Sequence, residues 1–145
     1  MPPDQDAHKA AIRRFHDATN SRDLQQISAA ADELYAPDAL IHTPVSAGAG
    51  GAQSVKQGFA MLLQAFPDLH VEIEDLLADG ETLVSRNVVS GTHRGEFMGH
   101  PPSGARVSYP EIFIFRFDGD RVAESWGVVD VFGLLRQMGL VASPF

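Results

Sequence analysis

The sequence contains no cysteine, and this absence excludes disulfide bonds, thiolate zinc sites, iron–sulfur clusters and a cysteine nucleophile. It also contains no long apolar run, which argues against a membrane-spanning helix. Its first residues have neither a basic cluster nor an apolar core, so we do not expect a signal peptide. These absences together predict a soluble protein of the cytoplasm.

Positive charge is scarce. Only 11 Lys and Arg residues stand against 19 Asp and Glu, and the formal net charge is −8. A chain this acidic gains nothing from a phosphate backbone or an anionic membrane surface, so we expect neither nucleic acid nor membrane as a partner. A hydrophobic small molecule or a protein partner is the remaining expectation.

Motifs for common cofactors are also missing. The chain has no Gly-x-Ser-x-Gly, no phosphate-binding loop and no dinucleotide fingerprint. Its six histidines are scattered, and no two have the i, i+4 spacing of helical metal ligands. We therefore expect no metal and no cofactor.

The chain has 145 residues, of which 44% are hydrophobic, so a single globular domain over 1–145 is expected, with 1–5 disordered. Apolar residues at helical spacing predict helices from Asp6 to about residue 19, over 24–34 behind an Asp23 cap, and from a Ser54 cap to residue 66. Residues 35–38 are expected to form a turn, 39–42 a short strand and 46–51 a flexible loop.

The periodicity changes to two after Pro67. Strands are predicted near 71–74 and over 82–92, 106–117 and 121–129, with turns at Asp79-Gly80 and Asp118-Gly119, an irregular connection over 95–104 and a final helix over 132–138. Helices followed by hairpin-linked strands indicate the α+β class. The predicted architecture is a cone: N-terminal helices packed in a strongly curved antiparallel sheet of about four long strands.

Five short segments resemble one family. They read LYAPD at 34–38, AFPDL at 65–69, GTHRGEFMGHPPSG at 91–104, FDGDRVAESW at 117–126 and DVFGLLRQMG at 130–139. In this order they are similar to the SnoaL-like polyketide cyclases, which belong to the nuclear transport factor 2-like superfamily of α+β cones. The superfamily contains isomerases, dehydratases, hydrolases, cyclases and domains that only bind.

The resemblance implies an intramolecular aldol closure of a polyketide ester without metal or cofactor. In such cyclases a carboxylate removes a proton from an activated carbon, and the pocket stabilises the resulting enolate. The family's aspartate base directly follows the Trp126 position, where this chain has Gly127. The helping glutamine and histidine on the preceding strand correspond to Glu111 and Phe113.

Glu111 is the most unusual residue in the sequence. Period two places it on one strand face with Tyr109, Phe113, Phe115 and Phe117. A carboxylate among aromatic rings has a raised pKa and can act as a base near neutral pH. The alternative is a strand-end glutamate that faces solvent or pairs with an arginine.

The register of the last hairpin decides what Glu111 faces. A two-residue loop at Asp118-Gly119 would place it opposite Trp126, whereas a three-residue loop with a bulge would place it opposite Gly127. We favour the three-residue loop, because it places large residues opposite small ones on the neighbouring strand and lets Arg116 reach Glu124. It also places Trp126 on the outer face, which favours a subunit interface.

Other candidates have two interpretations each. Asp130 is either a second pocket acid or, as we favour, the cap of the final helix. His42 and His93, each at a strand end, are either proton shuttles or rim histidines bonded to backbone. Arg86 either faces a carboxylate in the pocket or pairs with Glu72 or Glu74. The predicted catalytic set is Glu111, His42, His93 and Asp130. The predicted pocket residues are Phe15, Phe59, Arg86, Tyr109, Phe113, Phe115 and Gly127.

Two classes of function are compatible with these residues. The first is a cofactor-free enzyme, an isomerase or lyase of the cyclase type, that abstracts a proton from a hydrophobic carbonyl compound with Glu111 as base and His42 or His93 assisting. The second is a catalytically silent domain of the same fold that binds a small molecule or a protein. Because the strands carry apolar residues on both faces, we also expect a homodimer packed sheet to sheet.

Overall fold

The change of hydrophobic period at Pro67 is also a change from helix to strand in the structure. The computed structural model describes residues 4–43 and 50–142. Three helices and one strand come first: α1 (Gln5–Asn20), α2 (Leu24–Leu34), β1 (Tyr35–His42) and α3 (Gly51–Ala65). Four strands and a short helix follow: β2 (His70–Asp79), β3 (Thr82–Thr92), β4 (Arg106–Asp118), β5 (Arg121–Val129) and α4 (Val131–Gln137). The α+β class is thereby confirmed.

The five strands form one sheet in the order β1-β5-β4-β3-β2. The pairs β2–β3, β3–β4 and β4–β5 are antiparallel, as hairpin-linked strands must be. The pair β1–β5 is parallel, so the sheet is mixed, and the predicted curved antiparallel sheet is its β2–β5 part. No hairpin constrains β1, because α3 and three other strands separate it from β5.

Three local predictions in the first half were wrong. Residues 35–38 belong to β1 rather than to a turn, and Pro37 is tolerated there because the pairing with β5 is irregular between Tyr35 and Leu40. Gly50, not Ser54, precedes the first turn of α3. Gln5 is already helical, with Asp4 as the cap of α1, while most of the expected disordered lead and of the 46–51 loop lies outside the described residues.

The last hairpin has neither of the two registers considered from the sequence. Asp118 pairs with Arg121, and the register then shifts between Arg116 and Phe117. As a result Glu111 lies opposite Val129, and Phe113 lies opposite Gly127. The irregularity, and not a longer loop, supplies the extra residue on β5. The expected contact between Arg116 and Glu124 is confirmed at 3.3 Å.

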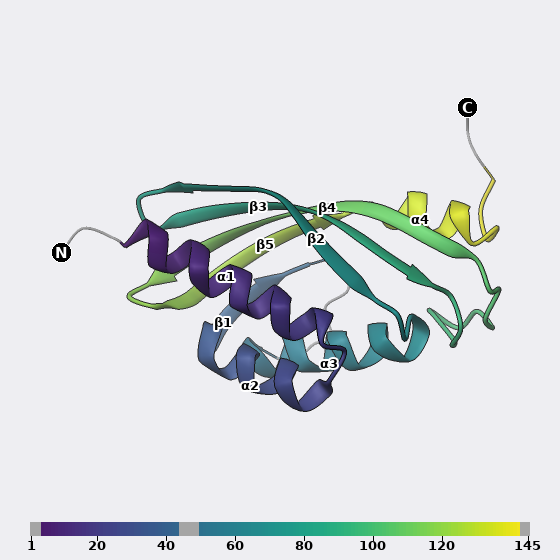
Figure 1. Cartoon of the computed structure of the whole chain (residues 1–145), viewed down its shortest axis with the longest axis horizontal. Helices are drawn as coiled ribbons and strands as arrows, with labels where there is room; N and C mark the ends of the chain where they lie inside the picture. Colours follow the sequence, from purple (N-terminus) through teal and green to yellow (C-terminus); the bar gives the residue numbers. More distant parts are fainter. Residues whose placement is uncertain (1–3, 44–49, 143–145) are drawn as a thin grey trace.

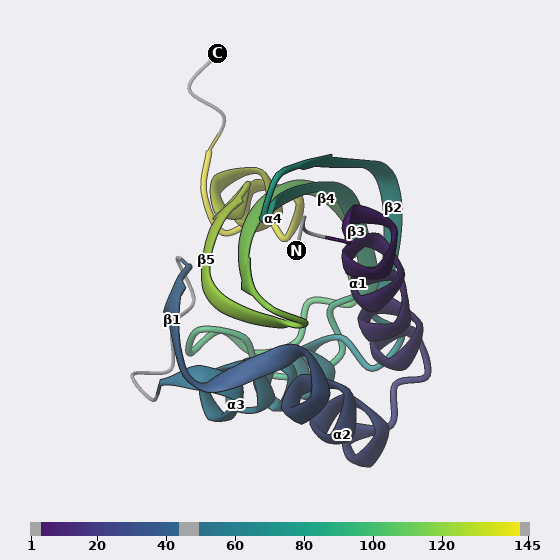
Figure 2. The same cartoon turned by 90° about the vertical axis from the view of Figure 1, so that its left-hand side faces the viewer.

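The sheet curls strongly, and the helices close its open side (Figure 1). Seen along the long axis, β2 to β5 form an arch, with α1 on one side and α2 and α3 beneath it (Figure 2). Buried apolar residues form two clusters: one is built around Ile12, Phe15 and Phe117, and the other around Phe66, Phe97 and Tyr109. Within the described ranges, no helix is long and apolar enough to cross a membrane.

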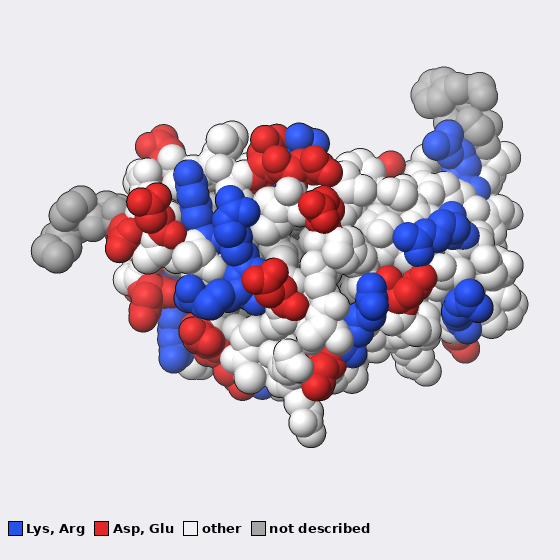
Figure 3. Space-filling view, in the orientation of Figure 1, with Lys and Arg blue, Asp and Glu red and all other residues white. Residues whose placement is uncertain are grey.

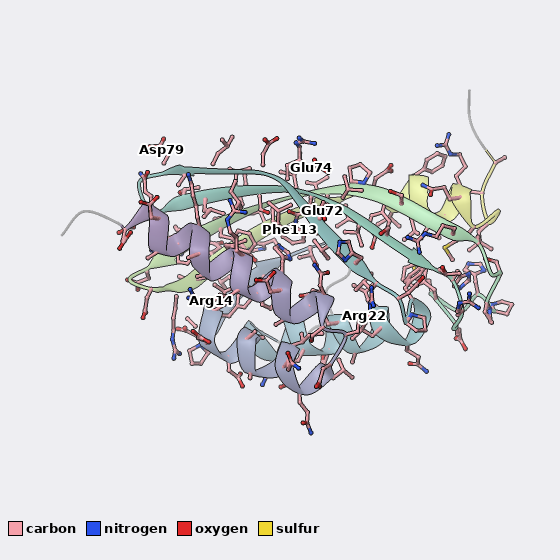
Figure 4. The ribbon with its side chains drawn as sticks, viewed as in Figure 1. Arg14, Arg22, Glu72, Glu74, Asp79 and Phe113 are labelled. Carbon is pink, nitrogen blue, oxygen red and sulfur yellow. The ribbon has the colours of Figure 1, made fainter. Side chains whose placement is uncertain are left out.

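Acidic and basic side chains are interspersed over the face of the molecule that carries α1 (Figure 3). Ion pairs on the surface of the molecule include Lys56 with Asp32 at 2.8 Å and Arg14 with Glu33 at 3.9 Å. Exposed pairs of this kind contribute little to stability. In Figure 4, Arg14, Arg22 and Asp79 lie at the periphery, whereas Phe113 lies among the strands.

Candidate functional site

A cavity of about 140 Å³ lies between the concave face of the sheet and the helices. Its wall is mostly apolar. Five of the residues predicted for the pocket line it, namely Phe15, Phe59, Tyr109, Phe113 and Phe115. The aromatic rings contact one another: the centroids of Phe15 and Phe59 are 5.6 Å apart, and those of Phe113 and Phe115 are 6.0 Å apart. An apolar wall lowers the local dielectric constant and so strengthens electrostatic effects inside the cavity.

Glu111 is the acidic side chain of this wall, and a short polar chain supports it. The Asn87 amide, from the neighbouring strand β3, donates to Glu111 Oε1 at 3.1 Å. The Ser85 hydroxyl donates to Asn87 Oδ1 at 2.6 Å. Both Ser85 and Asn87 are fully buried. The sheet register explains the arrangement, because Asn87 pairs directly with Glu111 and therefore points to the same face.

The environment of Glu111 favours its protonated form. Burial raises the pKa of Glu111 from 4.5 to about 7, and the hydrogen bond from Asn87 acts in the opposite direction. The alternative of an ion pair with an arginine is therefore wrong: the polar partner is an amide. At neutral pH the carboxyl group exchanges readily between its protonated and charged forms, which is the property of a general base or acid.

Two tyrosines from different strands line the cavity near Glu111. Burial raises the pKa of the Tyr35 and Tyr109 hydroxyls, and the charge of Glu111 raises it further. Both hydroxyls therefore stay protonated at neutral pH and are able to donate hydrogen bonds to a ligand. Sequence reasoning missed Tyr35 because residues 35–38 were expected to form a turn.

Three of the residues predicted to be catalytic lie away from the cavity wall. His42 is on the outer face, where its Nε2 lies 2.8 Å from Glu124 Oε2 and its ring stacks on Trp126. His93 is fully buried, and its Nδ1 is bonded by the hydroxyl and the backbone N–H of Ser103. Asp130 caps α4 by accepting from the Gly133 N–H at 2.9 Å, which agrees with the favoured interpretation.

Arg86 was predicted for the pocket and is not there. It pairs in the sheet with Ile112, one residue out of phase with Glu111, so its side chain projects from the outer face. There it forms an ion pair with Asp75 at 2.7 Å, rather than with Glu72 or Glu74. A register shift in β2 between Ile73 and Asp75 changes which acid lies opposite.

Gly127 does not line the cavity, because Phe113 covers it. A Cβ atom at Gly127 would overlap the Phe113 ring. The two residues pair directly across β4 and β5. The aromatic ring thus fills the space in front of the position where the resemblance places the family's aspartate.

Sequence reasoning also missed Asn87 and His16. Asn87 alternates with Leu83 and Val89 on one face of β3, and this period-two pattern was a usable signal. His16 lies on the buried stripe of α1 with Ile12 and Thr19, and it lines the cavity. Among the described residues no group of three or more His, Cys, Asp or Glu side chains is placed to hold a metal ion.

Comparison with known proteins supports a specific relationship. The family described as SnoaL-like polyketide cyclase matches residues 9–138. The chain is similar to IdmH, a candidate polyketide cyclase from Streptomyces antibioticus, with 30% identity, a TM-score of 0.77, and coverage of 91% of this chain and 98% of that one. It is also similar to AclR, a candidate hydroxylase from Streptomyces galilaeus, with 28% identity, a TM-score of 0.79 and coverage of 93% and 97%.

A third solved structure, TsrD from Streptomyces laurentii, has 26% identity, a TM-score of 0.84 and coverage of 96% of this chain and 99% of that one. A search of curated proteins gave no match. These relatives carry different descriptions on one fold, so the reaction has to be argued from the cavity itself.

Proposed function

The chain belongs to the SnoaL-like polyketide cyclase family, and from this premise we propose that it is a cofactor-free enzyme that removes a proton from the carbon next to a carbonyl group of a small hydrophobic molecule. Glu111 is the base. The observation that carries the proposal is a carboxyl group with a pKa of about 7 in an apolar cavity. Perturbed acids of this kind are concentrated at catalytic sites.

The chemical step uses only groups of the cavity wall. The Glu111 carboxylate takes the proton, and the electron pair of the broken C–H bond moves to the carbonyl oxygen to form an enolate. The Tyr35 or Tyr109 hydroxyl donates a hydrogen bond to that oxygen and stabilises its charge. Protonated Glu111 then returns the proton, either to carbon in an isomerisation or to the new alkoxide after aldol closure.

Asn87 is a positioning residue in this mechanism. Its hydrogen bond fixes one carboxylate oxygen and leaves the other, Oε2, available for the substrate. The bond also limits the rise of the Glu111 pKa, so that a useful fraction of the carboxylate is charged at neutral pH.

A catalytically silent binding domain is the second candidate function. It is favoured by Gly127 and by the Phe113 ring that covers it, because together they remove the carboxylate that the resemblance places on β5. In this alternative the same cavity holds a hydrophobic ligand without changing it.

The two candidates differ in a solvent-exchange assay that needs no knowledge of the natural substrate. Acetophenone carries exchangeable protons beside its carbonyl, and their replacement by deuterium in heavy water is followed by NMR. We expect the wild type to accelerate the exchange and Glu111→Gln to lose the acceleration by a factor of about 10²–10⁴. Glu72→Gln, an exposed glutamate on β2, is the matched control and should leave the rate unchanged. Exchange no faster than in buffer, with acetophenone bound, would favour the silent domain.

A further inference from the structure

One titratable side chain of the cavity wall has no part in the proposed proton transfer. His16, on α1, is only 7% exposed and lines the cavity. Neither of its ring nitrogens has a hydrogen-bond partner within the described ranges. A buried polar group without a partner is destabilising, so such a group calls for an explanation.

The buried polar atoms without a hydrogen-bond partner indicate where a ligand would bind. In the described part of the chain these atoms are the two His16 nitrogens, Ser125 Oγ and His93 Nε2. His16 and Ser125 both line the cavity, whereas His93 does not. Two of the three residues with unpaired polar atoms therefore belong to the wall of this cavity, where a ligand can supply the partner.

The state of the His16 ring defines the chemistry of that partner. Burial lowers the pKa of His16 to about 4, so the imidazole is neutral at physiological pH. A neutral imidazole has one N–H donor and one acceptor nitrogen, and no protein contact fixes which is which. A hydroxyl group can pair with either nitrogen, because it both donates and accepts. A carboxylate or a carbonyl can pair only with the N–H.

His16 also addresses a different part of the ligand from Glu111. His16 is on α1, which packs on β2 and β3, whereas Glu111 is on β4. The two side chains therefore come from different parts of the cavity wall. The cavity of about 140 Å³ is comparable to the dry cavity of about 150 Å³ that holds a benzene ring, so a single ring fits inside it.

We infer that His16 is a specificity-determining residue that binds a neutral hydroxyl group of the carbonyl substrate, at a part of the cavity wall other than the one that carries Glu111. The carbonyl part of this inference rests on the proposed function, and the hydroxyl part rests on the cavity alone.

A matched pair of probes tests the hydroxyl part. Para-hydroxyacetophenone and para-methylacetophenone have the same shape and the same carbonyl, and they differ only in a hydroxyl or a methyl group; the meta isomers form a second pair. Dissociation constants are measured by calorimetry at about pH 6, where the phenol is neutral. For at least one pair we expect the wild type to bind the hydroxyl compound about tenfold more tightly, the equivalent of about 1.4 kcal/mol.

His16→Leu should reduce this preference to twofold or less while it keeps or improves binding of the methyl compound. His16→Gln, which retains a donor and an acceptor, should keep part of the preference. Nitrogen NMR of the wild-type imidazole gives a readout that does not depend on the folding of a variant: the hydroxyl compound should shift the His16 resonances, and the methyl compound should not. Equal affinity of the wild type for both compounds of each pair, or a preference that survives in His16→Leu, would overturn the inference.

Glu111→Gln separates this inference from the proposed function. That variant should lose proton exchange and keep the hydroxyl preference. A wild type that shows the preference but no exchange would contradict the proposed enzyme and support the His16 site. A wild type that shows exchange without the preference would support the enzyme and contradict the His16 site.

Discussion

At the scale of single residues, the chemistry of Glu111 depends on what surrounds its carboxyl group. An aromatic wall disfavours the charged form, and one amide hydrogen bond partly restores it. The same balance determines how the residue affects folding. Its pKa is higher in the folded state than the ordinary value of 4.5, so its contribution to stability is fully present below about pH 4.5 and is lost as the pH rises through about 7.

Glu111→Gln should therefore stabilise the fold at high pH. The amide never acquires a charge, so the variant avoids the cost of burying one. We expect its free energy of unfolding to match that of the wild type near pH 4.5 and to exceed it above pH 7, by at most about 3 kcal/mol. Urea denaturation at the two pH values measures the difference. A variant that is less stable than the wild type at pH 8 would contradict the burial of this carboxyl group.

Asn87→Leu tests the hydrogen bond that favours the charged form of Glu111. Without the amide donor the pKa of Glu111 should rise further, and the acid limb of the exchange rate should move to higher pH. Ser85→Ala, which removes a contact of Asn87 but not its bond to Glu111, should move the limb less. Equal profiles for Asn87→Leu and the wild type would show that Asn87 has no influence on the base.

Sequence patterns predict Glu111 well and His16 poorly. Period-two alternation places Glu111 among aromatic residues whatever the register, because every second residue of a strand shares a face. The prediction of Arg86 as a pocket residue was wrong because the sheet face on which it lies depends on the register of β3 against β4, which the sequence alone does not fix. His16 has a recognisable position on a buried helical stripe, but the absence of a partner for its nitrogens is a tertiary property.

At the scale of elements, the junction between β1 and α3 is constrained by one glycine. Gly51 has a φ of +61°, and a Cβ atom there would overlap the carbonyl oxygen of Pro37. This close approach packs the first turn of α3 onto β1, and α3 supplies Phe59 to the cavity wall. The sequence offers Gly51 only as part of a glycine-rich loop, and the partner that makes it necessary is 14 positions earlier in a segment expected to be a turn.

Gly51→Ala should consequently destabilise the protein more than an alanine at an open glycine. Gly104 has a φ of +74° and nothing within 4 Å of a Cβ atom, so Gly104→Ala incurs only the left-handed backbone cost of about 1–2 kcal/mol. We expect Gly51→Ala to lower the free energy of unfolding by at least 1 kcal/mol more than that control, about the cost of an overpacked contact. Comparable losses of unfolding free energy in the two variants would mean that the β1–α3 contact rearranges at little cost.

The pairing of Phe113 with Gly127 links β4 to β5 in a comparable way. Gly127→Ala forces the Phe113 ring to move, whereas the double change Phe113→Ala with Gly127→Ala does not. We expect the double variant to lose less stability than the sum of the losses in Gly127→Ala and Phe113→Ala, a coupling that a double-mutant cycle measures directly. Additive losses would contradict the overlap.

At the scale of the whole molecule, the outer face of the sheet has no cover among the described residues. Ile112, Ile114, Trp126 and Val128 project from β4 and β5, and Val128 is 74% exposed. This side of the strands is the one that the helices do not reach (Figure 2). We propose, as the sequence predicted, a homodimer packed through this face.

Val128→Asp should dissociate such a dimer, because it places two like charges near a symmetric, apolar interface. Light scattering at micromolar concentration should give twice the chain mass of 15.7 kDa for the wild type and the chain mass for the variant. Leu24→Asp, on the exposed side of α2, is the control and should leave the dimer intact. A wild type of 15.7 kDa would contradict the dimer.

The pH dependence of deuterium exchange into acetophenone tests the role of Glu111 most directly. The account predicts a wild-type rate that is constant above about pH 8 and falls tenfold per pH unit below an inflection near pH 7, the pKa of the free base. It predicts no such inflection in Glu111→Gln, whose residual rate should follow that of buffer. A wild-type inflection near the ordinary glutamate value of 4.5, or the same profile in Glu111→Gln, would contradict the assignment of Glu111 as the base.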